Sequence, residues 1–176
     1  MVTATQAAWA AAAAVVDPEI RVITLEELGV LRDVEVTGDG AVMVTITPTY
    51  IGCPAMDVIR SDLAAAIRAA GHDQVVVRTV FRPSWTTDMI SPGGREKLRA
   101  AGIAPPAHVG AVATGVRAPD GARHLTILSD NPVQPPPCPR CGSADTEEIS
   151  HFGSTACKSL WRCDRCREPF DHIKAL

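Results

Sequence analysis

The sequence is poor in aromatic side chains, which make up 4% of its 176 residues. Val, Ile, Leu and Ala must therefore supply most of any hydrophobic core. The sequence also lacks a run of consecutive Lys and Arg residues, and its formal net charge is −3. Because affinity for a phosphate backbone depends on clustered positive charge, this composition argues against a nucleic acid as the partner.

A long apolar segment is missing as well. The most apolar run, residues 7–16, is far shorter than the roughly 20 residues that a membrane-spanning helix needs, and no cationic stretch precedes it. We expect this run to form the first helix of a cytoplasmic protein that has no membrane partner. Hydrophobic residues are 46% and charged residues 21% of the chain, a balance typical of a globular protein that buries a core.

A proline-rich stretch divides the sequence. Residues 131–137 read NPVQPPP, and four prolines in seven residues favour an extended backbone that continues neither a helix nor a central strand. We therefore predict two domains joined by a linker: an α/β domain at 1–130, the linker at 131–137 and a cysteine-rich module at 138–176.

Periodicity in the first domain predicts alternating helices and strands. β-branched residues alternate on both sides of Gly38-Asp39-Gly40, which is typical of a hairpin, and apolar residues spaced three or four apart follow Pro54, which is typical of a helix. We expect an α+β fold in which helices pack on one face of a small mixed sheet. The expected helices are 3–16, one from Pro54 to the residues before Gly71, and one from Ser91-Pro92 to 98; the expected strands are 31–36, 41–47 and an interior strand at 75–81, with weaker strands near 109–116 and 124–128.

Four of the six cysteines form two C-x2-C pairs. Cys138 and Cys141 are separated by 21 residues from Cys163 and Cys166, a spacing typical of a zinc ribbon, and the residues between the pairs predict a β-hairpin. A module of this size buries too little surface to fold alone, so the metal is expected to stabilise it. Ligand count and spacing leave two interpretations open, structural zinc or a rubredoxin-like iron or iron–sulfur centre.

Three other potential ligands lie in the same module. Since four thiolates fill a tetrahedral shell, we leave Cys157 out of the ligand set and interpret it as a small buried apolar side chain. For the same reason we expect His151 and His172 to be surface histidines.

Cys53 is the lone cysteine of the first domain. If Pro54 is the first residue of a helix, Cys53 is its N-cap, where the helix dipole stabilises a thiolate and lowers the thiol pKa. A thiolate there would act as a nucleophile or a soft-metal ligand, whereas an isolated cysteine is more commonly buried and inert. No histidine is spaced suggestively near it. The side chains expected around it are two acids from one loop and two hydroxyls from the preceding segment, namely Asp17, Glu19, Thr47 and Thr49.

Four short segments carry a family resemblance. In their order along the chain they resemble the SufT/PaaD-type iron–sulfur assembly domain, over about residues 15–81. The segments are Asp17-Pro18-Glu19, Leu28-Gly29, Thr47-Pro48-Thr49-Tyr50 and Gly52-Cys53-Pro54.

Later segments resemble the phenylacetate-degradation D (PaaD) family in particular, so that the likeness covers most of the chain. The stretch 107–130 departs from it, being longer than the family's usual connection. The segments that carry this second resemblance are Trp85-Thr86-Thr87-Asp88, residues 102–106, 138–143 and 152–158, and Glu168-Pro169-Phe170.

The resemblance implies an accessory protein of aerobic phenylacetate degradation, with no turnover of its own. Its implied role is maturation or repair of the iron–sulfur or iron centres of the multicomponent phenylacetyl-CoA 1,2-epoxidase. The implied partners are the epoxidase components, especially the iron–sulfur flavoprotein reductase. The family's functional thiol maps onto Cys53, which would transiently hold iron or a cluster, and its acidic motif maps onto Asp17 and Glu19.

Other functions remain open at this point. The four-cysteine site could be a rubredoxin-like electron-transfer centre of the same oxygenase. Cys53 could be an enzymatic nucleophile, or both cysteine sites could be structural parts of a scaffold. Two copies of the chain could also form a homodimer that combines their Cys53 thiols on one cluster.

Overall fold

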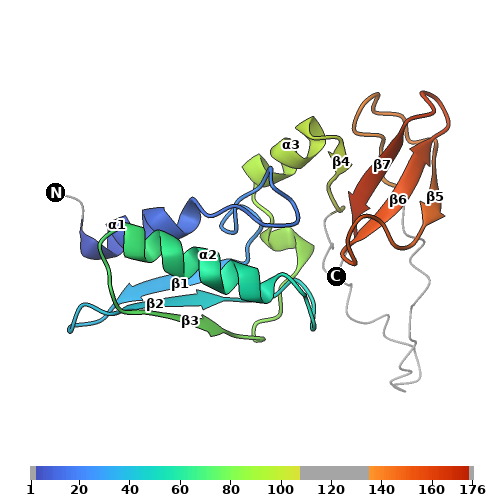
Figure 1. Cartoon of the computed structure of the whole chain (residues 1–176). Coiled ribbons are helices and arrows are strands. Elements are labelled where there is room, and N and C mark those ends of the chain that lie inside the picture. The colour runs from blue at the N-terminus through green and yellow to red at the C-terminus, as the bar shows by residue number, and fades with distance from the viewer. Residues whose placement is uncertain (1–2, 108–134, 175–176) are drawn as a thin grey trace, which may run out of the picture.

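The computed structural model of the chain describes residues 3–107 and 135–174 (Figure 1). We call 3–107 the N-terminal region and 135–174 the ribbon. The weaker strands expected at 109–116 and 124–128 and part of the linker fall outside the described residues, so the domain boundaries remain a prediction. The elements are α1 (Ala4–Ala13), β1 (Leu31–Val36), β2 (Val42–Ile46), α2 (Met56–Ala69), β3 (Val75–Thr79), the 3-10 turn η1 (Thr87–Met89), α3 (Pro92–Ala100), β4 (Ile103–Ala104), β5 (Thr146–Ser150), β6 (Lys158–Cys163) and β7 (Pro169–Ile173).

The N-terminal region contains a mixed three-stranded sheet in the order β1-β2-β3. β1 and β2 form the predicted antiparallel hairpin, whose turn includes Gly40 at a φ of +85°. β3 runs parallel to β2 after the crossover helix α2. The expectation that the third strand is interior is wrong, because β3 lies at the edge of the sheet and Val76 is 56% exposed. Its apolar run reflects β propensity rather than burial.

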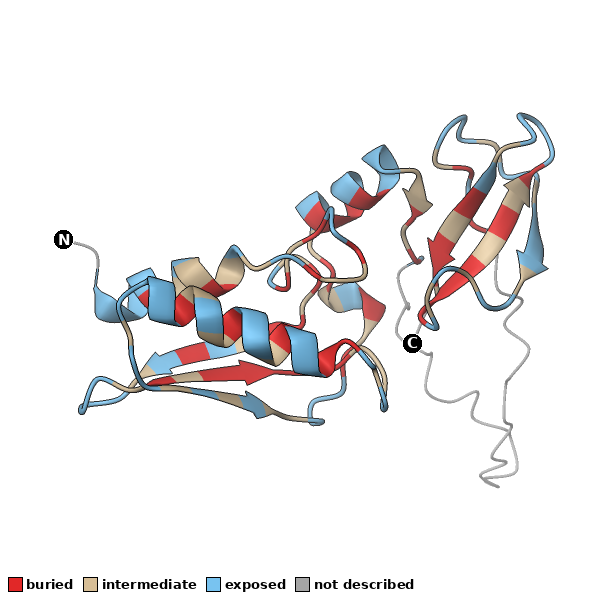
Figure 2. Ribbon diagram, in the orientation of Figure 1, coloured by how far each residue is buried: buried red, intermediate tan, exposed pale blue. Residues whose placement is uncertain are grey.

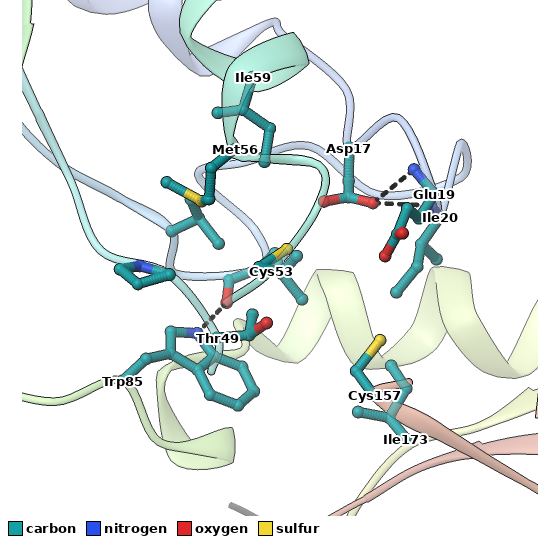
Figure 3. Close-up of a pocket in the computed structure, with 13 residues that line it drawn as sticks. Asp17, Glu19, Ile20, Thr49, Cys53, Met56, Ile59, Trp85, Cys157 and Ile173 are labelled. Carbon is teal, nitrogen blue, oxygen red and sulfur yellow. Dashed lines mark hydrogen bonds between the residues drawn. The ribbon is translucent and has the colours of Figure 1, made fainter. Parts of the chain in front are cut away.

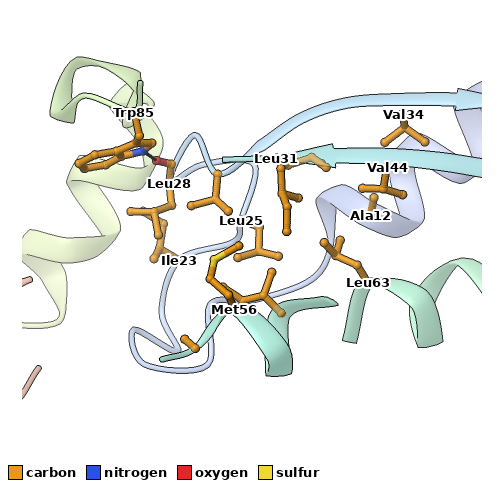
Figure 4. Packing of buried hydrophobic residues seen from close by; sticks show 14 of the residues in the cluster. Ala12, Ile23, Leu25, Leu28, Leu31, Val34, Val44, Met56, Leu63 and Trp85 are labelled. Carbon is orange, nitrogen blue, oxygen red and sulfur yellow. Dashed lines mark hydrogen bonds between the residues drawn. The ribbon is translucent and has the colours of Figure 1, made fainter. Parts of the chain in front are cut away.

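Helices α1 and α2 cover one face of this sheet (Figures 1 and 2). The apolar side of α2 is the one predicted from its spacing, and Leu63 and Ile67 on it have no exposed surface. From α1, the small side chains of Ala8 and Ala12 let the helix approach the core closely (Figure 4). The resulting core is mainly aliphatic, as the shortage of aromatics required, with Trp85 as its aromatic member among the described residues.

Helix α3 does not cover the sheet but packs against the turn at residues 23–27. The helix begins at Pro92, at the expected place, and Ser91 caps it, with its Oγ accepting from the Gly94 amide at 3.0 Å. Gly94 faces the turn so closely that a Cβ there would lie 2.8 Å from Ile23 Cδ1. Glu27 in the turn holds the helix through its carbonyl, which accepts from the Ser91 amide, and through an ion pair with Lys97 at 2.7 Å.

The ribbon forms a second sheet in the order β4-β7-β6-β5. The β5–β6 hairpin was predicted, whereas β7 and β4 were not. β4 belongs to the N-terminal region and pairs in parallel with β7. Two residues also cross between the regions: Ala104 lies in the small core of the ribbon, and Ile173 of β7 lies in the large core of the N-terminal region. The ribbon is therefore joined to the rest of the molecule by both pairing and packing.

Across the residues that the structure describes, no helix combines the length and the apolar character that crossing a membrane requires.

Candidate functional site

The four cysteines of the two C-x2-C pairs converge at one end of the ribbon. Their Sγ atoms all lie within 4.8 Å of one another. The cross-pair distances are 3.7 Å between the sulfurs of Cys138 and Cys166 and 3.6 Å between those of Cys141 and Cys163. A tetrahedron with metal–sulfur bonds of about 2.3 Å has edges of about 3.8 Å, so the four sulfurs fit a tetrahedral metal ion.

Tight turns hold these thiols in place. In the first pair the Gly142 amide donates to the Cys138 carbonyl at 2.9 Å, and Gly142 adopts a φ of +72°, a conformation that glycine tolerates well. In the second pair the Cys166 amide donates to the Cys163 sulfur at 3.5 Å. This amide is the main cause that lowers the pKa of the Cys163 thiol to about 7, whereas the pKa of the neighbouring Cys166 thiol is raised, so one thiolate forms readily in the cluster and a bound metal would favour the others. The predicted ligand set is thus brought together as a metal-binding cluster.

A second site surrounds a cavity between the N-terminal region and the ribbon (Figure 3). Its volume of about 20 Å³ is enough for about one water molecule or one metal ion. It lies beyond the carboxyl end of β2, where the chain turns into α2, the position at which α/β units commonly bind ligands. Its apolar wall includes Leu28, Met56, Ile59, Trp85 and Ile173, while the ionisable side chains lining it are Asp17, Glu19, Cys53 and Cys157.

Asp17 shapes the acidic side of the cavity. Its Oδ1 accepts from the amides of Glu19 at 2.9 Å and Ile20 at 2.7 Å, which fixes the turn that carries Glu19 to the cavity. Both of these bonds go to Oδ1, so Oδ2 is left for the cavity. Asp17 is 6% exposed, and burial raises the pKa of its carboxyl even though the two amides act in the opposite direction. As expected, the loop that carries Asp17 and Glu19 folds against Cys53, and all three residues line the cavity.

Cys53 is partly buried and lines the same cavity. The expectation that it caps the helix is wrong, since α2 begins at Met56, its N-cap is Ala55, and no side chain caps it. The expectation of a lowered pKa is wrong as well: burial raises the pKa of the Cys53 thiol, and the charges of Glu19 and Asp17 add to the effect. Without a partner of opposite charge the group is therefore a thiol at neutral pH.

Cys157 is the residue that sequence reasoning missed. It is buried as expected, with 9% of its surface exposed, but it does more than fill ribbon space, because it lines the cavity together with Cys53. Its sulfur lies 3.1 Å from the Thr155 hydroxyl, and burial raises the pKa of its thiol. No periodicity pointed to this placement, because it depends on how the ribbon packs on the other region.

The two threonines of the candidate set separate in the structure. Thr49 lines the cavity, whereas Thr47 is 1% exposed and is not among the lining residues. In the ribbon, His151 is exposed as predicted. The prediction fails for His172, which is 6% exposed because β7 packs it beside Trp161.

Two features of the resembling segments support the cavity wall. The Trp85 indole donates to the Leu28 carbonyl at 2.9 Å, and Trp85 is buried in the core (Figure 4). Gly29 adopts a φ of +77°, and a Cβ at this position would lie 2.6 Å from that of Met89. The Leu28-Gly29 pair therefore permits a close approach of two backbone segments behind the cavity.

Comparison with known families gives one match in each part of the chain. Residues 5–78 match the family described as iron–sulfur cluster assembly protein, and residues 124–174 match the PaaD zinc beta ribbon domain. Cys53, Asp17 and Glu19 fall in the first match, and Cys157 and the four-cysteine cluster fall in the second.

Individual relatives extend the likeness over both parts. A protein of Escherichia coli (strain K12), named for a component of a 1,2-phenylacetyl-CoA epoxidase, is 43% identical over 170 residues, which cover 96% of this chain and 91% of that protein. An Fe-S protein maturation auxiliary factor of Porphyromonas gingivalis is 40% identical over 44% of this chain and 73% of its own length. Among solved structures, a DUF59 domain of unknown function from Bacillus anthracis matches with a TM-score of 0.50 and 27% identity, covering 54% of this chain and 91% of that one.

Proposed function

Because the chain belongs to the PaaD family, in which an iron–sulfur assembly domain is joined to a zinc ribbon, we propose that it is an accessory factor for maturation or repair of iron–sulfur or iron centres. Its proposed client is a multicomponent phenylacetyl-CoA 1,2-epoxidase, and above all the iron–sulfur flavoprotein reductase of that system. The cargo, iron or a cluster, is held transiently by Cys53.

The observation that carries this proposal is the cavity in which Cys53 meets two carboxylates. Burial and neighbouring acids raise the pKa of this thiol, so its thiolate form is disfavoured. A bound cation would stabilise the thiolate and lower the pKa. Such a site is suited to transient loading, since protons compete with the metal for the sulfur. The cavity offers no histidine as a general base among its lining residues, which argues against a nucleophilic enzyme.

The four-cysteine cluster is proposed to hold structural zinc. All four ligands come from the protein and leave no open coordination position, as in structural rather than catalytic zinc sites. The metal would fix the two turns and, through them, the strands β6 and β7 that reach the cavity.

The proposal is tested by replacing Cys53 with Ser and producing the epoxidase components in the same cells. We expect the reductase purified from these cells to contain less iron and acid-labile sulfide than with the native chain. The matched control is Val58→Ala, a change on the exposed side of α2 that should leave the reductase unaffected. Unchanged cluster content with Cys53→Ser, at equal amounts of folded protein, would refute the role of the thiol.

One observation favours a second candidate function. Two of the four clustered cysteines, Cys141 and Cys166, are exposed, so an iron ion there would lie near the surface, where electrons can pass to a partner. The protein would then be a rubredoxin-like electron-transfer component of the same oxygenase. Anaerobically purified protein decides between the two: zinc without visible absorption ends the electron-transfer hypothesis, and one redox-active iron per chain supports it.

A further inference from the structure

The cavity receives thiols from both regions of the molecule. Cys53 comes from the loop between β2 and α2, and Cys157 from the residue immediately before β6 in the ribbon. In Figure 3 the two sulfurs and the carboxylates of Asp17 and Glu19 are turned towards the same space. Neither region alone places two sulfurs at this point.

The electrostatics of the cavity favour a cation. Burial is the main cause that raises the pKa of the Cys53 thiol, and the charges of Glu19, Asp17 and Cys157 add to it; burial also raises the pKa of the Cys157 thiol, and the charge of Glu19 adds to it there. The positive charge of Lys158 acts in the opposite direction at Asp17 and at Cys157, but its ammonium is also engaged by Ser154 at 3.0 Å and lies 3.8 Å from Asp171. The two carboxyls and two thiols that line the cavity thus share one ammonium with other groups, a situation that a bound metal ion relieves.

We propose that Cys157 is the second thiol ligand of the cargo metal, so that the ribbon completes the site that Cys53 begins. This inference rests on the proposed function, in which Cys53 holds iron. The ligand class is a thiophilic divalent ion such as Fe²⁺, with Asp17 Oδ2 and Glu19 as the oxygen donors. As the metal binds, each thiol releases its proton to solvent, and no oxidation is needed.

The site takes its final geometry only with the metal. Among the described residues, the ribbon cysteines form the compact set whose donor atoms all lie within 4.8 Å, and the cavity groups are more widely spaced. Rotation of the two cysteine side chains about their Cα–Cβ bonds moves the sulfurs without a backbone change. The Cys157 sulfur lies 3.1 Å from the Thr155 hydroxyl. Rotation of the Cys157 side chain would replace this hydrogen bond with a bond to the metal.

Co²⁺ is a suitable probe because its sulfur-to-metal charge-transfer absorbance rises with the number of bound thiolates. The experiment adds Co²⁺ without oxygen to the full chain whose four-cysteine cluster already contains zinc. We expect the native protein to show two-thiolate absorbance. Cys157→Ser should halve the absorbance per cobalt and weaken binding about tenfold or more. Ile149→Ala, an exposed ribbon position outside the cavity, should match the native protein.

The outcomes separate the two proposals. If Cys157→Ser keeps the native absorbance and affinity while Cys53→Ser loses them, the inference about Cys157 is overturned and the proposed function stands. If neither variant changes cobalt binding, both fail. Zinc content and thermal unfolding of each variant establish that it is folded.

A measurement on the native chain avoids any folding defect of the variants. Alkylation by iodoacetamide, followed by mass spectrometry, reports each thiol separately. Fe²⁺ should slow modification of Cys53 and Cys157 together and at the same metal concentration. Protection of Cys53 alone would contradict a shared site.

Discussion

The two regions of the molecule reach stability by different means. Among the described residues, the large core contains 21 buried hydrophobic residues, all but Ile173 from the N-terminal region, whereas the ribbon core contains five, two of which are the proposed metal ligands Cys138 and Cys163. The first region can therefore fold on hydrophobic burial, whereas the ribbon is expected to depend on metal coordination. We therefore expect metal binding to control the half of the cavity that the ribbon supplies while the other half stays formed.

Metal removal should have the largest effect of the changes considered, because it should unfold one region and leave the other folded. Structural zinc contributes about 10–16 kcal/mol in zinc-finger peptides, so chelation should unfold the ribbon and leave the N-terminal region folded. Amide hydrogen exchange can measure this: the amides of β6 should lose protection while those of β2 keep theirs. Cys163→Ser, which removes a fully buried ligand, should have the same effect. Protected β6 amides in metal-free protein would contradict this account of the ribbon.

Truncating a side chain in the large core should destabilise the N-terminal region and leave the metal site of the ribbon intact. Leu63 on α2 is fully buried, and Leu63→Ala should lower the free energy of unfolding of the N-terminal region by about 2–5 kcal/mol. The metal of the ribbon should remain bound at native stoichiometry. Urea unfolding combined with metal analysis checks both points, and the control is Val58→Ala on the exposed side of the same helix, which should change stability by less than about 0.5 kcal/mol. Loss of metal from Leu63→Ala would show that the regions fold as one unit.

Acid should weaken the ribbon through a buried histidine. Burial lowers the pKa of His172 to about 4 from its ordinary 6.5. Between these two pH values the unfolded chain binds a proton at this residue and the folded chain does not. The contribution of the neutral ring to stability is present above pH 6.5 and is lost as the pH falls towards 4, up to about 3 kcal/mol. Urea unfolding at pH 7 and pH 5, followed by the NMR signal of the Trp161 indole beside this ring, measures the loss.

Two variants isolate that effect from protonation of the metal thiolates, which all variants share. His172→Gln should show a smaller loss of stability between pH 7 and pH 5 than the native chain. His151→Gln, at an exposed position, should behave as the native chain does. An equal pH dependence in all three would mean that His172 is not the group that titrates.

Sequence periodicity predicted the elements that local interactions determine. The hairpin at residues 31–47 was found because alternating β-branched residues flank a glycine turn, and the apolar side of α2 was found because its four buried residues repeat at helical spacing. The two C-x2-C pairs were found because the ligands of each pair are neighbours in the chain. In each case the residues that interact are close in sequence or share a period.

Features that depend on distant packing were not predictable in this way. Local pattern does not reveal that β3 lies at an edge, that β4 joins the ribbon or that His172 is buried, because each follows from which surfaces meet. The helix was predicted to begin at Pro54, but α2 begins at Met56. A proline fits the turn before a helix as well as the first helical position, so Pro54 alone does not determine where the helix begins. Cys157 was interpreted as a small buried apolar side chain, since Cys53, which lines the same cavity, is far away along the chain.

The parallel pairing of β4 with β7 has a consequence for the order of events during synthesis. Its two strands are far apart in the sequence, so the second sheet cannot be completed until β7 has been made, long after β1, β2 and β3 are available. During that interval the nascent chain carries Cys53 on an open surface without Cys157 and Ile173 over it. Enclosure of the Cys53 thiol therefore waits for β7, and until that strand is in place the thiol is more open to oxidants and stray metal ions than in the folded protein.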